Sequence, residues 1–141
     1  MNFELLKEFI LEGPLTCQVK GSCMGRPVLP GCQLRLAHRR TLWPGDIVTC
    51  KRGNDELVSH RMLGYLPGRG GWRVITRADT ASHADHPVPV HNVLGAVTHL
   101  DGKPYRPGPG IRIRALTAWF PAALNWLINR LVAVAQRGRG R

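Results

Sequence analysis

Residues 43–63 read Trp43-Pro-Gly-Asp-Ile-Val-Thr-Cys-Lys-Arg-Gly-Asn-Asp-Glu-Leu-Val-Ser-His-Arg-Met-Leu63, and this stretch decides the class of fold. It holds two runs with strand character, Asp46–Arg52 and Glu56–Leu63, which the turn residues Gly53 and Asn54 separate. Valine, isoleucine and threonine fit a pleated, half-buried surface, and Gly-Asn pairs favour turns. The stretch therefore predicts two neighbouring strands joined by a short turn.

The same pattern of short runs and turns continues on both sides. The 16 glycines and 11 prolines of the chain fall mostly between these runs, which suits a loop-rich β structure. Near the N-terminus the apolar spacing of Phe3–Leu11 instead predicts a short helix, stopped by Gly13-Pro14. The four remaining strand predictions are Leu15–Lys20, Gln33–Ala37, Trp72–Arg77 and Asn92–Leu100. We predict a compact, mostly β domain over residues 1–101.

The C-terminal part has a different composition. Residues 102–114 are rich in proline and glycine and are interpreted as a linker. Residues 115–141 are interpreted as an apolar segment that contains an amphipathic helix, running to about Gln136, and a basic tail. Pro121 is the expected first residue of that helix. The uncharged run Ala115–Asn129 is shorter than the ~18 residues that a membrane-spanning helix needs. The helix is therefore expected to lie on a membrane surface, on the β domain, or on a second copy in a homodimer.

Charge and the N-terminal sequence limit the partners and the compartment. The formal net charge of +11 would attract nucleic acid, anionic lipid or acidic peptides. No helix-turn-helix or aromatic-basic strand motif is present, which argues against nucleic acid. The N-terminal helix lacks the features of a secretory signal. We expect a cytoplasmic protein, peripheral at the inner face of the membrane, whose four cysteines stay reduced.

Five side chains could carry chemistry. Ser22 and Cys23 follow a glycine in a predicted turn, His60 lies on a predicted strand, and Asp79 and Asp85 lie in a predicted loop. A thiol needs a base to become a nucleophilic thiolate, and an imidazole is such a base near neutral pH. A carboxylate can hold that imidazole in the useful tautomer. These residue types indicate nucleophilic catalysis, although such a set also arises by chance.

The order of the motifs makes this interpretation more specific. The sequence resembles the superfamily of serine endopeptidases that unites signal peptidases with the self-cleaving LexA-type repressors. The resemblance covers Leu15 to Val97, and His60-Arg61 is similar to the archaeal and endoplasmic-reticulum branch, in which histidine replaces the bacterial lysine. The motifs that carry it are Gly21-Ser22-Cys23-Met24 with Gly31, Gly45-Asp46-Ile47-Val48, His60-Arg61, Ala78-Asp79, Asp85 and Leu94-Gly95-Ala96-Val97.

The resemblance implies roles for these residues. Cys23 takes the place of the nucleophilic serine and His60 that of the base, while Asp79, or as the second choice Asp85, orients His60. The chain departs from the family pattern at Cys23, at Arg26 before the displaced proline, and at Cys32 after Gly31. A slip of one residue would make Ser22 the nucleophile, but it would break the fit of Met24, which is expected to pack beside the nucleophile turn.

The resemblance predicts an endopeptidase that hydrolyses a peptide bond in an extended peptide or protein substrate. The alternative is a catalytically inactive module on the same fold that binds peptides or the membrane surface. Asp46 is interpreted as structural. His83, His86 and His91 are interpreted as a solvated loop rather than a zinc site, because no CxxC pair accompanies them. We expect neither a metal nor a cofactor.

Overall fold

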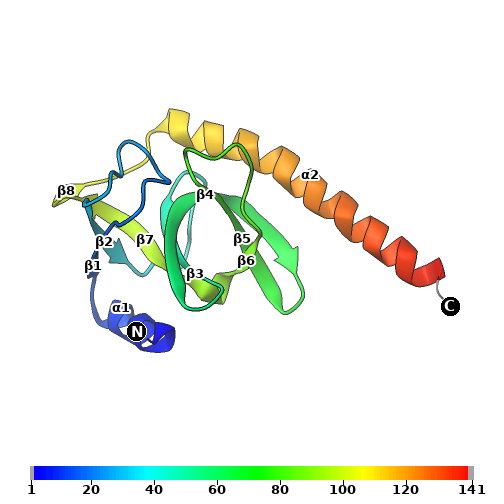
Figure 1. Cartoon of the computed structure of the whole chain (residues 1–141), viewed down its shortest axis with the longest axis horizontal. Helices are drawn as coiled ribbons and strands as arrows, with labels where there is room; N and C mark the ends of the chain where they lie inside the picture. Colours follow the sequence, from blue (N-terminus) through cyan, green and yellow to red (C-terminus); the bar gives the residue numbers. More distant parts are fainter. Residues whose placement is uncertain (1, 140–141) are drawn as a thin grey trace.

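The computed structural model describes residues 2–139, and in this range one antiparallel sheet is flanked by two helices (Figure 1). The sheet order is β1-β2-β7-β3-β4-β5-β6, and β8 pairs with β7. The strands are β1 (Leu15–Gln18), β2 (Gln33–Ala37), β3 (Ile47–Arg52), β4 (Glu56–Gly68), β5 (Gly71–Arg77), β6 (Val88–Pro89), β7 (Val93–Leu100) and β8 (Lys103–Pro104). The helices are α1 (Phe3–Glu12) and α2 (Pro109–Arg139), and a 3₁₀ turn, η1, spans Val90–Asn92. The predicted mostly β fold with a helix at each end is confirmed.

The six predicted strands all form, and most of their ends agree with the sequence pattern to within one or two residues. The largest difference is in β4, which continues to Gly68 rather than ending at Leu63. Its register with β5 shifts between Met62 and Gly64, so a bulge bends the strand there. Beyond the bulge, pairing resumes and runs to Gly68 opposite Gly71.

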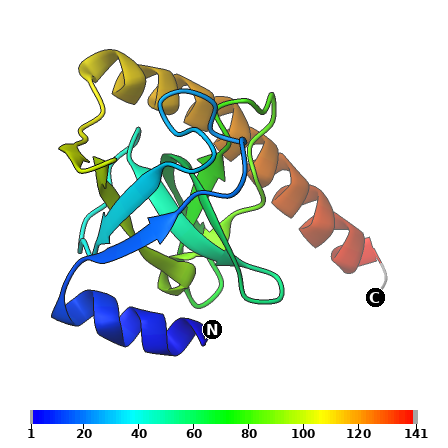
Figure 2. The same cartoon turned by 60° about the vertical axis from the view of Figure 1, so that its left-hand side comes forward.

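Both faces of the sheet are buried at the central strand β3. Ile47 and Val48 are adjacent in β3 and belong to different core clusters, because successive strand residues point to opposite faces. Phe3 and Ile10 of α1 pack in the cluster of Ile47. Gly95 makes room for this packing, since a Cβ atom there would lie 2.6 Å from Cδ1 of Ile10 and 2.7 Å from the carbonyl oxygen of Ala37. Figure 2 shows α1 and α2 on opposite sides of the β structure.

Helix α2 begins at Pro109, so residues 102–114 are not a continuous linker. They contain β8 and, from Pro109 onward, the first residues of α2. The prediction that Pro121 starts the helix is wrong, because Pro121 lies inside it. Tertiary contacts support the earlier start, since Arg112 donates to the carbonyl oxygen of Pro44 at 2.9 Å. Of the predicted helix and tail, residues 140–141 lie outside the described residues.

The middle of α2 is docked on β4. Gly64 leaves room for the indole of Trp119, because a Cβ atom there would lie 2.4 Å from the ring. Nε1 of Trp119 donates to the carbonyl oxygen of Tyr65 at 3.0 Å. Leu63 and Ile75 form a third core cluster with Ala115 of the helix. Over residues 2–139, no helix is both long and apolar enough to cross a membrane.

Candidate active site

The imidazole of His60 is paired with the carboxylate of Asp85. His60 lies in β4, is only 6% exposed, and its Nδ1 is 2.6 Å from Oδ2 of Asp85. Asp85 belongs to the loop between β5 and β6, and two bonds to Thr76 fix its position. Its backbone N–H donates to the carbonyl oxygen of Thr76 at 2.8 Å, and Oγ1 of Thr76 donates to Oδ2 of Asp85 at 2.7 Å.

The surroundings of Asp85 keep its carboxyl group ionised. Partial burial by itself would raise the Asp85 pKa, but the contacts with His60, Arg52 and Thr76 outweigh that effect and lower it to about 2. Nη2 of Arg52 lies 2.7 Å from Oδ2 of Asp85, in an orientation that adds charge rather than a well-aligned hydrogen bond. Asp85 is therefore a fixed negative charge beside the ring of His60 near neutral pH.

This arrangement leaves one nitrogen of His60 free for chemistry. A carboxylate at Nδ1 favours the tautomer in which Nδ1 carries the proton, and Nε2 can then accept one. Nε2 makes no hydrogen bond within residues 2–139, and it is not sealed from solvent. The pair thus has the features of an oriented general base.

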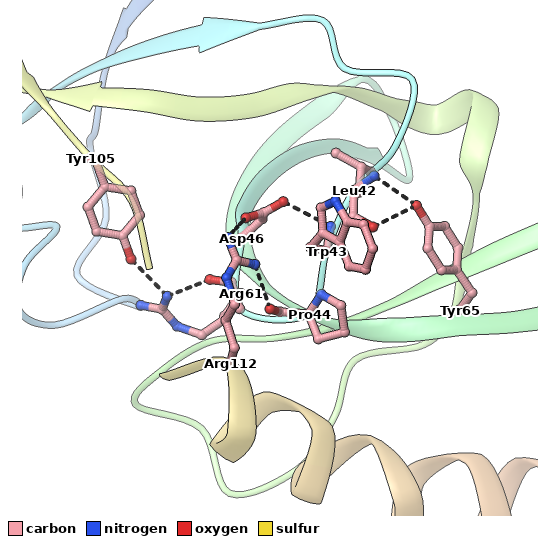
Figure 3. A network of polar contacts seen from close by, with 9 residues as sticks. Leu42, Trp43, Pro44, Asp46, Arg61, Tyr65, Tyr105 and Arg112 are labelled. Atoms are coloured by element: carbon pink, nitrogen blue, oxygen red, sulfur yellow. Dashed lines mark hydrogen bonds and ion pairs between the residues drawn. The ribbon is translucent and has the colours of Figure 1, made fainter. Parts of the chain in front are cut away.

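Asp79 has a different partner, and the prediction that Asp79 orients His60 is wrong. Its two carboxylate oxygens accept from Nε and Nη2 of Arg61 at 2.7 and 2.6 Å. Nη1 of Arg61 also donates to the carbonyl oxygen of Gly45 and to the hydroxyl of Tyr105, each at 2.9 Å (Figure 3). Burial by itself would lower the Arg61 pKa, but the bonds with Asp79 and Tyr105 raise it. Asp85, the second choice in the sequence analysis, is the carboxylate that contacts His60.

The Trp43-Pro-Gly-Asp46 turn is structural, as predicted for Asp46. The Asp46 carboxylate accepts a hydrogen bond from the backbone N–H of Trp43 at 2.9 Å and pairs with Arg112 of α2 at 3.2 Å (Figure 3). Gly45 has a φ of +97° and lies so close to the Arg112 backbone that a Cβ atom would meet its Cα at 3.2 Å. The turn, which precedes β3, therefore packs against the start of α2 and holds it by an ion pair and a hydrogen bond.

The loop of Cys23 is attached to the loop that carries both aspartates. The carbonyl oxygen of Cys23 accepts from the backbone N–H of Thr80 at 3.2 Å and from its hydroxyl at 2.6 Å. Met24 is buried in the main core, while Ser22 and Cys23 are exposed. Within residues 2–139 the Cys23 thiol forms no hydrogen bond with His60. The link through Thr80 was not predicted, because a threonine in a loop has no distinctive sequence signal.

The other three cysteines are poor candidates for nucleophiles. Burial raises the pKa of the Cys17 thiol and, with the help of Asp101, that of Cys32. Burial is also the main reason why the pKa of Cys50 is raised to about 11, an effect that nearby Arg52 partly opposes. These three side chains stay protonated near neutral pH, so they are weak nucleophiles.

A basic cavity lies beside the Cys23 loop. It has a volume of about 280 Å³, and its polar lining consists of Arg26, Arg61, Arg77, Asp79 and Arg114. Asp79 pairs with Arg61, whereas no carboxylate of the described residues pairs with the other three arginines. These three come from distant parts of the chain, so no sequence spacing could have indicated the cavity. Its excess positive charge suits an anionic group.

The three histidines of the Pro-rich region are exposed, in agreement with a solvated loop. In the part of the chain that the structure covers, residues 2–139, no three His, Cys, Asp or Glu side chains come together to hold a metal ion.

Neither the family models nor the curated proteins compared with this chain match it.

Proposed function

We propose that this protein is a signal-peptidase-like endopeptidase with Cys23 as the nucleophile, His60 as the general base and Asp85 as the orienting carboxylate. The observation that carries the proposal is the 2.6 Å contact between Nδ1 of His60 and Asp85, with Nε2 left unbonded. The exposed thiol of Cys23 supports it, because its loop is attached through Thr80 to the loop of Asp85.

In this reaction the Cys23 thiol transfers its proton to Nε2 of His60, and the thiolate attacks the carbonyl carbon of the scissile peptide bond. The tetrahedral intermediate collapses as the C–N bond breaks, and His60 returns the proton to the leaving amine. Water, deprotonated by His60, then hydrolyses the thioester and regenerates the Cys23 thiol. Asp85 stays ionised throughout and stabilises the imidazolium that forms at each step.

The basic cavity suggests a feature of the substrate. Arg26 belongs to the same loop as Cys23, so a peptide lying across that loop could place an acidic side chain or its C-terminal carboxylate among Arg26, Arg77 and Arg114. We expect peptides with an acidic residue near the cleavage site to be cut faster than their amide counterparts. The double variant Arg77→Gln/Arg114→Gln should remove this preference.

The direct test is incubation of the full chain with a peptide library, followed by mass spectrometry of the products. Cleavage should be lost in Cys23→Ala and in His60→Ala and should persist in Ser22→Ala, the matched neighbour. Cleavage that survives Cys23→Ala but not Ser22→Ala would make Ser22 the nucleophile. Cleavage that survives both would remove this loop from the mechanism.

A second candidate is an inactive module on the same fold that binds extended peptides. The observation that favours it is the absence of a hydrogen bond between the exposed Cys23 thiol and His60 within residues 2–139. Alkylation with iodoacetamide at several pH values separates the two candidates. A base-assisted thiol should react faster than Cys17 at neutral pH and slow down in His60→Ala. An alkylation rate unaffected by His60→Ala, in a protein without cleavage products, favours the binding module.

A further inference from the structure

Helix α2 has apolar side chains on two faces, and only one of these faces is covered. The inner side packs on β4 and β5 with small and aromatic residues, among them Ala115, Trp119 and Trp126. From Leu127 to Arg139 every residue is exposed. Figure 1 shows this last part of α2 extending beyond the β structure.

The uncovered side is a continuous apolar stripe. Its members follow one another at intervals of three or four residues, so they share one helix face. This outer stripe consists of Ile113, Leu116, Phe120, Leu124, Leu127, Leu131 and Val134. Each of these side chains is between 46% and 67% exposed. At 1.5 Å per residue the stripe is about 32 Å long, far more exposed apolar surface than isolated surface residues present.

The charges beside the outer stripe all have one sign. Helix α2 contains no aspartate or glutamate. Helical geometry places Arg114 and Arg139 on one side of the stripe and Arg130 and Arg137 on the other. Arg139, Arg130 and Arg137 lie roughly a quarter-turn from its centre, and Arg114 lies about a third of a turn from it. Arg130 and Arg137 also line a hollow with Arg69 and Arg73 of the β4–β5 hairpin. An apolar face flanked by arginines is the pattern of a helix that lies in a bilayer interface.

Charge decides between a lipid surface and a second copy of the chain. The spacing of the outer stripe would also suit helix pairing, in which flanking positions of the two helices carry opposite charges. Here both helices would bring arginines and no carboxylate to the seam. An anionic bilayer instead provides an apolar interior for the stripe and negative headgroups for the arginines on both sides.

We propose that the outer stripe of α2 docks the protein on an anionic lipid surface, with the helix axis in the plane of the interface. Such docking is independent of the proposed peptidase activity, because no residue of the stripe belongs to the candidate active site. Arg114 also lines the basic cavity, so the stripe itself, rather than this arginine, is the sharper place to test the proposal.

The test is co-sedimentation of the full chain with vesicles of phosphatidylcholine alone and with added phosphatidylglycerol. The wild type should bind the anionic vesicles at least tenfold more tightly, and high salt should weaken that binding. The triple variant Phe120→Asn/Leu127→Asn/Leu131→Asn should lose at least tenfold in binding, whereas Leu29→Asn, a change at an exposed leucine outside α2, should not. Arg130→Gln/Arg137→Gln should lose about fivefold per arginine.

Circular dichroism during heating shows whether the variants still fold, which is expected because the changed side chains are exposed. Equal binding by the wild type and the triple variant would overturn the proposal, as would failure of the wild type to bind anionic vesicles. Sedimentation velocity tests the alternative that a second copy of the chain covers the outer stripe. A dimer that forms without vesicles and dissociates in the triple variant would assign the stripe to a second copy instead.

Discussion

His60 and Arg61 are adjacent in β4, yet they take their carboxylates from two places in one loop and use them differently. His60 meets Asp85 through a single nitrogen and keeps the other unbonded, whereas Arg61 binds both oxygens of Asp79. An imidazole can exchange a proton near neutral pH, and a guanidinium cannot. The difference leaves the first pair able to transfer a proton, as the proposed function requires, and makes the second a fixed link between β4 and the loop.

The largest expected effect separates the two aspartates by activity. Asp85→Asn should lower the rate of peptide cleavage about a hundredfold or more, because the amide favours the wrong tautomer of His60. Asp79→Asn is the matched control and should retain most of the activity at a temperature where both variants are folded. Cleavage rates on one peptide measure the effect. Equal losses in the two variants would contradict the division of roles.

The second comparison concerns stability. Arg61→Met should lower the free energy of unfolding by about 3 kcal/mol, because it leaves Asp79 without its partner. His60→Gln should cost about 1 kcal/mol, since Arg52 and Thr76 still contact Asp85. Urea denaturation near pH 7 gives both values. A larger loss in His60→Gln than in Arg61→Met would make the His60 pair the main structural one.

Lowering the pH should reduce the stability of the folded protein by protonating the Asp85 carboxylate. The Asp85 pKa is lowered to about 2 in the folded protein, below the ordinary aspartate value near 3.9. The folded state therefore gains stability from this group above pH ~4 and loses it as the pH falls toward ~2, by up to about 2 kcal/mol. Urea denaturation from pH 5 to pH 2 measures the loss. In Asp85→Asn the same scan should be flatter, and an unchanged scan would show that other carboxyl groups dominate.

The smallest expected effect concerns the hydrogen bond between Arg61 and Tyr105. Tyr105→Phe removes one hydrogen bond to Nη1 and should cost about 1 kcal/mol of unfolding free energy. The alkylation rate of Cys23 should stay unchanged, because Tyr105 contacts the Arg61 side of β4. A slower alkylation in Tyr105→Phe would show that the two sides of β4 are coupled.

The strands were predictable because the pattern of apolar and turn residues along the chain is local information. The same holds for the structural role of Asp46, which lies in the Trp43-Pro-Gly-Asp46 turn. The sequence could not decide which of two aspartates contacts His60. Asp79 and Asp85 are six positions apart in one loop, and only the path of that loop, set by the bond from Asp85 to Thr76, brings the second of them to the imidazole.

The sequence by itself determined the strand order along the chain, the short N-terminal helix and the set of side chains able to carry chemistry. The tertiary structure decided three further features: that α2 begins at Pro109, that three arginines share a cavity, and that Asp85 rather than Asp79 faces His60. The physical reason is the separation along the chain over which each kind of interaction acts. Strand and turn preferences act between neighbouring residues, whereas ion pairs and helix docking join segments that only the folded chain brings together.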